Sequence, residues 1–328
     1  MQPGPHRAAG GQPRSAVILD PLVQRLVDAA MTPPFLHELG PEDGRQALRE
    51  SQTVRVDDFG VDVAFHVAPT GPTGLVGFRI FRPAGATGPL PAVLYVHGGR
   101  WMLGDGQTHA RLVSELVCSA GVAAVVPEYS RTPEARYPVA VEECYALMNR
   151  IVRQAGELGL DADRLAVAGD CAGATMGTAL TLMAKLRSGP KVRAQLLYYP
   201  LTDAHCDSPS QREFATGYLL TREALRSYWR QYADRSGQQD EPTASPLRAG
   251  LAELAGLPPT MVITAEADVA RDEGERYADR LRHAGVAVTA ARFLGTIHDF
   301  VSLNPLRDSP PTRAAVLLGA SFLRSHLR

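Results

Sequence analysis

One short stretch of this sequence constrains the backbone more than any other. Residues 167–174 read Val-Ala-Gly-Asp-Cys-Ala-Gly-Ala and continue the apolar run 164–168. Gly169 and Gly173 stand two residues before and two residues after Cys171. A buried strand that enters a helix through so tight a turn needs small residues at both of these places, because strand and helix backbones nearly touch there. The pattern therefore predicts a strained strand–turn–helix unit with Cys171 at the turn.

The residues after the turn support this interpretation. Residues 175–186 are small and apolar, which is typical of a helix that packs on a sheet. We expect the side chain of Cys171 to be exposed at the tip of the turn. A buried structural role is the alternative, since free cysteine is among the most buried residue types. We favour that buried role for Cys118, Cys144 and Cys206, and the exposed role for Cys171.

A second motif lies directly after the apolar run 91–96. Here His97 is followed by Gly98 and Gly99. Glycines at the end of a strand let backbone N–H groups approach a ligand, as in an oxyanion hole. Gly98, Gly99 and the N–H of Ala172 are therefore candidate donors to a developing oxyanion, and His97 is expected to support the loop.

The next two residues, Arg100 and Trp101, are candidate substrate-binding residues. For Arg100 we favour an ion pair with a nearby carboxylate, and the binding of an acidic substrate group stays open.

Two polar motifs follow apolar runs near the end of the chain. Asp268 comes shortly after the run 260–263, and His298 comes shortly after the run 286–293. Both side chains are therefore expected at strand ends on one edge of a sheet. The order nucleophile, acid, histidine is that of one class of hydrolytic enzymes and differs from the orders in chymotrypsin and subtilisin.

Composition indicates a globular enzyme. The chain has 328 residues, 45% of them hydrophobic, and a formal net charge of -1, which gives no reason to expect nucleic acid or an acidic membrane surface as partner. We find no signal peptide and no membrane-spanning run, and therefore expect a cytoplasmic protein. Four scattered cysteines favour reduced thiols over disulfides or a zinc site. We expect neither a metal nor a cofactor. Many Arg and Ala residues beside only two Lys, at 185 and 191, are typical of a GC-rich bacterial genome.

The chain is expected to form one α/β unit with two helical additions. Residues 1–15 are predicted to be disordered, and helices are predicted at 20–30 and 41–50. Alternating strands and helices from Thr53 onward predict a mostly parallel sheet flanked by helices. One insertion, 205–235, interrupts this alternation. It contains Tyr218, Leu219 and several further aromatic residues.

Together these motifs resemble the hormone-sensitive lipase family of α/β-hydrolases, also called bacterial esterase family IV. The resemblance covers residues 45–325 and includes Glu128-Tyr129, Pro133-Glu134, the segment Tyr198-Tyr199-Pro200-Leu201-Thr202-Asp203, Ala265-Glu266-Ala267-Asp268 and Arg271-Asp272-Glu273. It implies an α/β-hydrolase fold with a core at 51–204 and 236–328 and a helical cap at 16–50 and 205–235. Substrate selection is expected in the cap, where Tyr218 and Leu219 are candidates. The family also allows a homodimer.

The resemblance also assigns roles to single residues. Cys171, His298 and Asp268 match the catalytic triad, and Gly98, Gly99 and Ala172 match the oxyanion hole. Asp170 matches the acidic residue beside the nucleophile and is expected to brace the turn. Three departures stand out: Cys171 replaces Ser, Arg100 replaces Gly, and Ala174 replaces the last Gly of the family's Gly-Asp-Ser-Ala-Gly-Gly motif.

These assignments predict an acyl hydrolase with a covalent acyl-enzyme. His298 would take the thiol proton and Asp268 would orient the imidazole. A neighbouring imidazolium and a helix N-terminus both favour a thiolate at Cys171. Because a thiolate leaves more readily than an alkoxide, aryl esters and thioesters are favoured as substrates, including a thioester on a carrier. Acyl transfer, or a cyclisation or elimination in specialised metabolism, is the alternative. A binding protein without turnover and an engineered Ser-to-Cys replacement also stay open.

Overall fold

A single mixed sheet forms the centre of the molecule. The computed structural model describes residues 17–30, 32–53 and 59–328. The predicted disorder at 1–15 lies outside these residues. Within the described part of the chain, eight strands form a sheet in the order β1-β2-β4-β3-β5-β6-β7-β8. The strands are β1 (Val61–Ala68), β2 (Val76–Pro83), β3 (Leu90–Val96), β4 (Ala123–Glu128), β5 (Leu160–Asp170), β6 (Ala194–Tyr198), β7 (Thr260–Ala267) and β8 (Val288–Ile297).

The sheet begins antiparallel and continues parallel. β2 pairs antiparallel with both β1 and β4, whereas all pairs from β4 across to β8 are parallel. The predicted mostly parallel sheet is therefore confirmed. The predicted alternation of strands and helices from Thr53 onward is wrong for the first three strands, which follow one another without a helix. A short turn suffices between β1 and β2 because they are antiparallel neighbours, and it contains Gly71 and Gly74 at positive φ. From β2 the chain passes without a helix to β3, leaving a place for β4 between them, and this connection contains Gly85 and Gly88 at positive φ.

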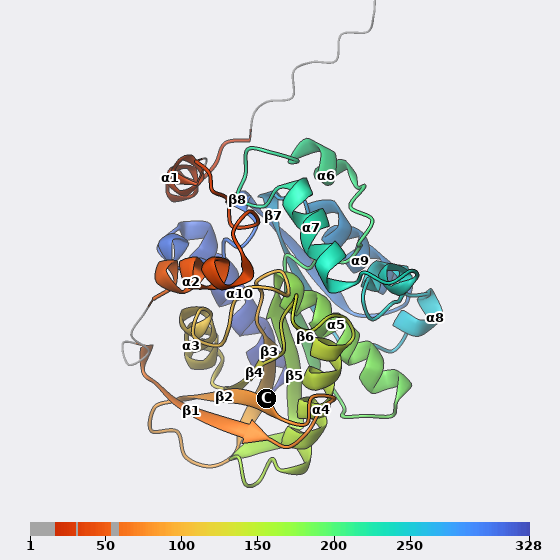
Figure 1. Cartoon of the computed structure of the whole chain (residues 1–328). Helices are drawn as coiled ribbons and strands as arrows, with labels where there is room; N and C mark the ends of the chain where they lie inside the picture. The colour runs from red at the N-terminus through yellow and green to blue at the C-terminus, as the bar shows by residue number, and fades with distance from the viewer. Residues whose placement is uncertain (1–16, 31, 54–58) are drawn as a thin grey trace, which may run out of the picture.

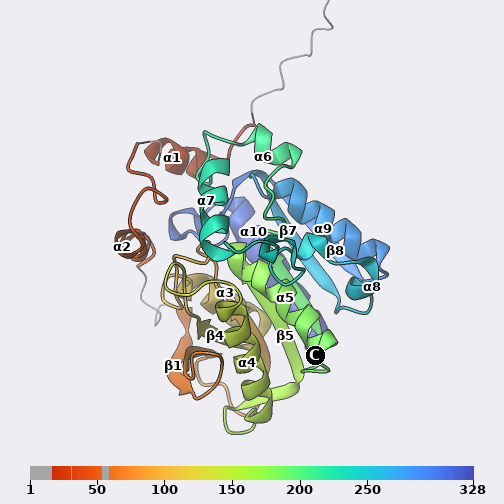
Figure 2. The same ribbon diagram turned by 45° about the vertical axis from the view of Figure 1, so that its right-hand side comes forward.

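Helices cover both faces of the sheet (Figures 1 and 2). One face carries α3 and α10, which pack against each other. The opposite face carries α4, α5, α8 and α9, with α4 against α5 and α8 against α9. These helices are α3 (Ala110–Ala120), α4 (Val139–Arg153), α5 (Cys171–Leu186), α8 (Leu251–Leu254), α9 (Arg271–His283) and α10 (Pro310–His326). The central strands are thus buried on both sides, as expected for parallel strands.

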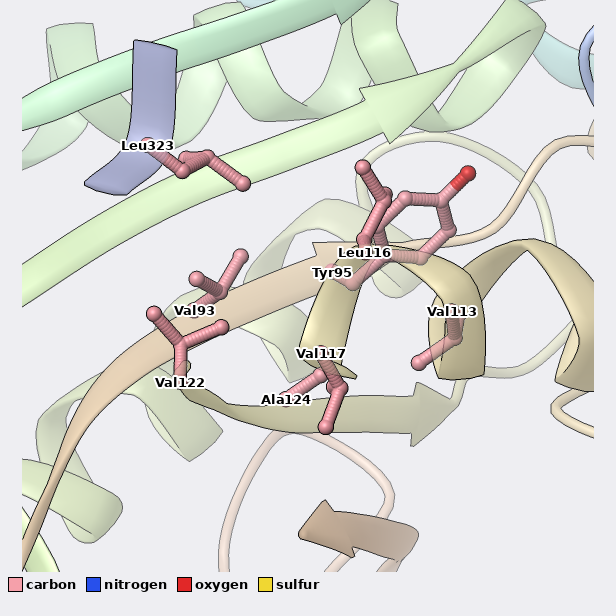
Figure 3. Close-up of a pocket in the computed structure, with 8 residues that line it drawn as sticks. All are labelled: Val93, Tyr95, Val113, Leu116, Val117, Val122, Ala124 and Leu323. Carbon is pink, nitrogen blue, oxygen red and sulfur yellow. The ribbon is translucent and has the colours of Figure 1, made fainter. Parts of the chain in front are cut away.

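The core between the sheet and the pair α3–α10 is densely packed. Figure 3 shows the void that remains there, which measures about 10 Å³. This is the space of about one water molecule, and a water needs polar partners that apolar walls do not offer. The void is therefore packing space and not a binding site. Its walls are Val93, Tyr95, Val113, Leu116, Val117, Val122, Ala124 and Leu323.

A further helical layer lies at one end of the sheet. Its members are α1 (Pro21–Ala29), α2 (Pro41–Ser51), α6 (Pro209–Glu213) and α7 (Arg222–Tyr232), and Figure 1 shows them in the upper part of the molecule. Asp20 caps α1 by accepting a hydrogen bond from the N–H of Leu22 at 2.9 Å, and a proline begins each of α1 and α2. Single 3₁₀ turns lie at Gln238–Asp240, Pro246–Arg248 and Asn304–Leu306.

Arg45 fastens α2 to the core. Its guanidinium donates to the carbonyl oxygens of Met102 at 2.9 Å and Thr132 at 2.8 Å, and it forms two hydrogen bonds with the Glu134 carboxylate. Because Met102 belongs to the loop after β3, this contact fixes the helical layer relative to that loop. Among the described helices, none has both the length and the apolar character required to span a bilayer.

Candidate active site

The turn between β5 and α5 holds Cys171 in a strained conformation. β5 ends at Asp170, α5 begins at Cys171, and the φ of Cys171 is 52°. A Cβ atom on Gly169 would lie 2.6 Å from the carbonyl oxygen of Val96, and a Cβ on Gly173 would lie 2.5 Å from that of His97. Only glycine fits at these two positions. Packing between β3 and α5 thus forces the nucleophile candidate into the left-handed region, where non-glycine residues are uncommon.

The structure brings Cys171, His298 and Asp268 together from three different strand ends. The Nδ1 atom of His298 lies 2.8 Å from Oδ2 of Asp268. The Sγ atom of Cys171 lies within 4.8 Å of a ring nitrogen of His298. The residues follow β5, β7 and β8, whose carboxyl ends meet at one edge of the sheet because these strands are parallel. This places a thiol, an imidazole and a carboxylate in one buried group.

The expected exposure of Cys171 is wrong. Cys171 has 0% of its surface exposed, and His298 has 1%. Asp299, which pairs with Arg100, lies beside Cys171. The local pattern does not contain such contacts between distant segments. The nucleophile candidate is therefore buried.

Arg100 forms the ion pair that we favoured over binding an acidic group. One Nη2 hydrogen bond joins it to Oδ2 of Asp299, and both side chains are buried. The other carboxylate oxygen of Asp299 lies 3.5 Å from Nε2 of His298. Sequence reasoning missed Asp299, although it directly follows His298 in the chain. Its place directly after His298 showed that it is near the imidazole but not that its carboxylate faces Nε2.

The imidazole of His298 is electrostatically unusual. Burial alone lowers the pKa of an imidazole, but the carboxylates of Asp268 and Asp299 outweigh burial, so the pKa of His298 lies well above its ordinary value. The ring of Tyr199, centred 4.8 Å from that of His298, packs against it. In the described structure, Nε2 of His298 has no hydrogen-bond partner. This atom is therefore available to a reacting group.

The predicted oxyanion donors differ in their availability. The N–H of Gly98 donates to Oδ1 of Asp170 at 3.0 Å, so the expectation that Gly98 serves as a free donor is wrong for this conformation. Among the hydrogen bonds of the described residues, the N–H of Gly99 has no partner. Ala172 lies in the first turn of α5, where N–H groups have no carbonyl four residues earlier. Gly99 and Ala172 thus remain the available pair.

Asp170 explains why Gly98 is engaged. This fully buried carboxylate accepts from Tyr95 Oη at 2.7 Å as well as from Gly98, and Nε2 of His109 lies 3.4 Å away. Burial opposes its ionisation, but His109 and the hydrogen bonds prevail and lower the pKa of Asp170. Correspondingly, the Asp170 carboxylate outweighs burial and raises the pKa of His109. The contacts join β3, β5 and α3 beneath the turn, which is a bracing arrangement.

His97 is placed as loop support. Its Nδ1 lies 2.7 Å from the carbonyl oxygen of Gly98, and its ring stacks on Tyr129 with centroids 4.3 Å apart. Burial, reinforced by repulsion from His109, lowers the pKa of His97 to about 4. The ring is therefore neutral at neutral pH and has its polar contact within the loop.

A cavity of about 520 Å³ lies between the N-terminal helices and the segment around α7. Tyr218 and Leu219 line it, as does Arg100. Trp101 is not among the described lining residues; its ring stacks on Tyr232 with centroids 4.3 Å apart. Most of the lining is apolar: Leu26, Val27, Ala30, Pro34, Phe35, Leu36, Ala47, Leu48, Ala215, Leu219, Leu220, Ala224, Leu303 and Pro305.

The other cysteines are separate from this group. Cys144 and Cys206 are buried, as predicted, and burial raises the pKa of both thiols. The prediction for Cys118 is wrong, because this residue is exposed and contacts the carbonyl oxygen of Phe59. Its place on the outer side of α3 reflects helix orientation, which the residue type alone does not reveal.

Comparison with known proteins agrees with this architecture. A family model described as the alpha/beta hydrolase fold matches residues 93–302, which include the loop after β3, the Cys171 turn and His298. The chain belongs to the α/β-hydrolase family. The predicted resemblance to the hormone-sensitive lipase type is thereby confirmed, since relatives of this α/β-hydrolase are carboxylesterases of that type.

Two curated relatives and one solved structure illustrate the similarity. An ethyl acetate hydrolase of Pseudomonas putida is 32% identical over 89% of this chain and 92% of its own length. A carboxylesterase of Mycobacterium tuberculosis is 32% identical over 87% of this chain and 89% of its own. The crystal structure of a thermostable esterase from Pseudomonas putida superposes on this α/β-hydrolase with a TM-score of 0.92 at 37% identity, covering 97% of this chain and 99% of that one.

Proposed function

We propose that this α/β-hydrolase cleaves carboxylic esters through a covalent acyl-enzyme on Cys171. The family makes the chain a hydrolase, and the relatives named above are esterases by name. The observation that carries the finer proposal is the position of Cys171. It occupies the strained turn at the start of α5, within 4.8 Å of a ring nitrogen of His298, whose other nitrogen contacts Asp268.

The mechanism follows from these contacts. The Cys171 sulfur attacks the ester carbonyl carbon, and the carbonyl oxygen turns toward the N–H groups of Gly99 and Ala172. The C–O bond to the leaving group then breaks, and His298 donates its Nε2 proton to that oxygen. Water, activated by the now neutral His298, attacks the thioester and releases Cys171. Asp268 fixes the orientation of the ring and stabilises the imidazolium.

Sulfur favours substrates with good leaving groups. In the tetrahedral intermediate a thiolate competes with the departing oxygen, and the group with the lower pKa leaves faster. An alkoxide loses that competition, whereas a nitrophenolate or a second thiolate does not. We therefore propose aryl esters and acyl thioesters, including thioesters on a carrier, as the preferred substrates. The apolar cavity beside Tyr218 and Leu219 suits an uncharged hydrocarbon portion of the substrate.

Kinetics with a matched control test this proposal. Cys171→Ala should abolish hydrolysis of p-nitrophenyl butyrate, while Cys118→Ala should leave it unchanged, because Cys118 is exposed on α3 and apart from the site. Full activity in Cys171→Ala would refute the nucleophile. The unaltered protein is also assayed on a panel of aryl esters and thioesters of different chain lengths. If it hydrolyses none of them, a binding protein is favoured over an enzyme.

Acyl transfer is a second candidate, supported by the burial of Cys171. Cys171 has no exposed surface, and the neighbouring cavity is largely apolar. An alcohol or amine held there would compete with water for the acyl-enzyme, which is itself a reactive thioester. Adding hexanol to the assay distinguishes the two outcomes. Transfer predicts a hexyl ester that increases with alcohol concentration, whereas hydrolysis alone predicts the free acid.

A further inference from the structure

His298 lies between two carboxylates, only one of which belongs to the expected triad. Asp268 contacts Nδ1 at 2.8 Å, and Oδ1 of Asp299 lies 3.5 Å from Nε2. Cys171 faces the same group, since its Sγ, a ring nitrogen of His298 and a carboxylate oxygen of Asp299 all lie within 4.8 Å of one another. The thiol and the second carboxylate are thus neighbours of one imidazole.

Asp299 is held firmly in this place. Its φ is 64°, a left-handed conformation that only Gly, Asn and Asp adopt readily. Its other oxygen is bonded to Arg100, whose guanidinium lies 5.9 Å from the centre of the Tyr228 ring. One oxygen of Asp299 thus faces Arg100 and the other faces the imidazole of His298.

The tyrosine hydroxyls around the imidazole carry no charge. Tyr199 packs against the ring from the end of β6, and burial raises the pKa of its hydroxyl well above the ordinary value, so it is neutral. Tyr228 of α7 has a raised pKa for the same reason and is also neutral. Asp268 at the end of β7 adds a second negative charge.

Two cationic side chains face Asp299: Arg100 pairs with its Oδ2 atom, and His109, whose pKa is raised, pairs with Asp170. Because Oδ1 of Asp299 faces Nε2 of His298 directly, this carboxylate is nearer to the imidazole than its Arg100 partner.

A protonated His298 suits a thiol nucleophile and disables a hydroxyl nucleophile. A serine can attack only after a neutral imidazole accepts its proton. A cysteine can give its proton to the imidazole at rest, after which the thiolate attacks and the imidazolium supplies the proton for the leaving group. We propose that Asp299, held by Arg100, is a positioning residue that commits this site to a thiolate by keeping His298 protonated. This inference rests on the proposed role of Cys171 as nucleophile.

The pH dependence of serine variants tests the inference. In Cys171→Ser, His298 must lose its proton before it can act as base, so hydrolysis of p-nitrophenyl butyrate should rise only at alkaline pH. Removing the Asp299 charge lowers the pKa of His298. Cys171→Ser/Asp299→Asn should therefore show the same rise at least about one pH unit lower, which means roughly tenfold more activity at a fixed pH on the rising limb. Asn is chosen because it retains the side-chain shape and accepts the left-handed backbone.

The pH dependence of the enzyme with Cys171 should shift in the same direction. Its activity requires the imidazolium, so it is lost as the pH rises through the pKa of His298. Asp299→Asn should move this loss to lower pH. The double variant Arg100→Gln/Asp299→Asn should move it in the same direction, and it leaves no unpaired buried charge that could prevent folding. Glu128→Gln serves as the matched control: it also breaks an Arg–carboxylate pair, with Arg79, but Glu128 has no contact with His298 in the described structure.

The outcomes separate this inference from the proposed function. One outcome overturns the inference but not the proposed function. Mass spectrometry detects acyl-Cys171, but the pH at which activity rises or falls is the same in the Asp299→Asn and double variants as in their parent enzymes. A full-activity Cys171→Ser at neutral pH would do the same. Failure to acylate Cys171 in any form of the enzyme would overturn the proposed function itself.

Discussion

Replacing Gly173 by Ala should damage the Cys171 turn more than any other single methyl group. A Cβ there would lie 2.5 Å from the carbonyl oxygen of His97 and closer still to that of Val96. Both obstacles are backbone atoms of β3 and its following loop, so relief requires β3 and α5 to separate. Overpacking usually costs about 1–3 kcal/mol, and with two rigid carbonyls in the way we expect a loss of about 3 kcal/mol or more.

That loss corresponds to a measurable shift in Tm. Unfolding entropy of about 2.1 cal/mol/K per residue gives roughly 0.7 kcal/mol/K for 328 residues, so 3 kcal/mol lowers Tm by about 4 °C. Gly177→Ala is the matched control in the same helix. Its Cβ would lie 3.3 Å from a methyl group of Val167, a contact that slight side-chain movement relieves. The gain in helix propensity of about 1 kcal/mol should leave Tm unchanged or slightly raised.

Calorimetry on the two variants tests whether β3 and α5 approach each other this closely. Equal Tm values for Gly173→Ala and Gly177→Ala would contradict the close approach of β3 to α5. A normal rate of ester hydrolysis in Gly173→Ala would contradict the claim that this approach positions Cys171.

Further predictions concern the reacting groups. His298→Ala should lower kcat by a factor on the order of 10² to 10⁴, the usual contribution of a general acid or base. Asp268→Asn should lower kcat less, because the Cys171–His298 pair persists in part without the Asp268 carboxylate. A larger loss of kcat in Asp268→Asn than in His298→Ala would argue against these roles. His97→Ala should lower Tm and leave most of the acylation, so complete loss of acylation in a folded variant would identify His97 as the base. Substoichiometric iodoacetamide should label Cys171 ahead of the exposed Cys118, and peptide mapping that finds the label mainly on Cys118 would argue against a resting thiolate.

Local sequence patterns predicted the parts of this structure that depend on local sterics. The glycine spacing around Cys171 located the turn, because two neighbouring backbones exclude any Cβ there. The apolar run 260–263 likewise located the beginning of β7, which continues to Ala267, and placed Asp268 close after that strand. Strand ends on one edge of a parallel sheet then brought Asp268 and His298 together. Each of these inferences needs only a few adjacent residues and the geometry of parallel strands.

Features that depend on distant contacts were not predictable in this way. Gly98 donates to Asp170, 72 positions later in the chain, and is thereby removed from the free oxyanion donors. Arg100 meets Asp299 across 199 positions, and Asp299 in turn lies beside the buried Cys171. Asp299 stood beside His298 in the sequence, but nothing local indicated that its carboxylate would turn back toward Nε2. Pairing partners of buried charges are set by the assembled fold.

The most direct test of the account is the identity of the acylated residue. The protein is mixed with p-nitrophenyl butyrate, quenched with acid within the first turnovers, digested and analysed by mass spectrometry, with Cys171→Ala treated in parallel. The account predicts one butyryl group on the peptide that contains Cys171 and none in the variant. Continued hydrolysis with the butyryl group on a different residue, or with no acylated residue at all, would contradict it.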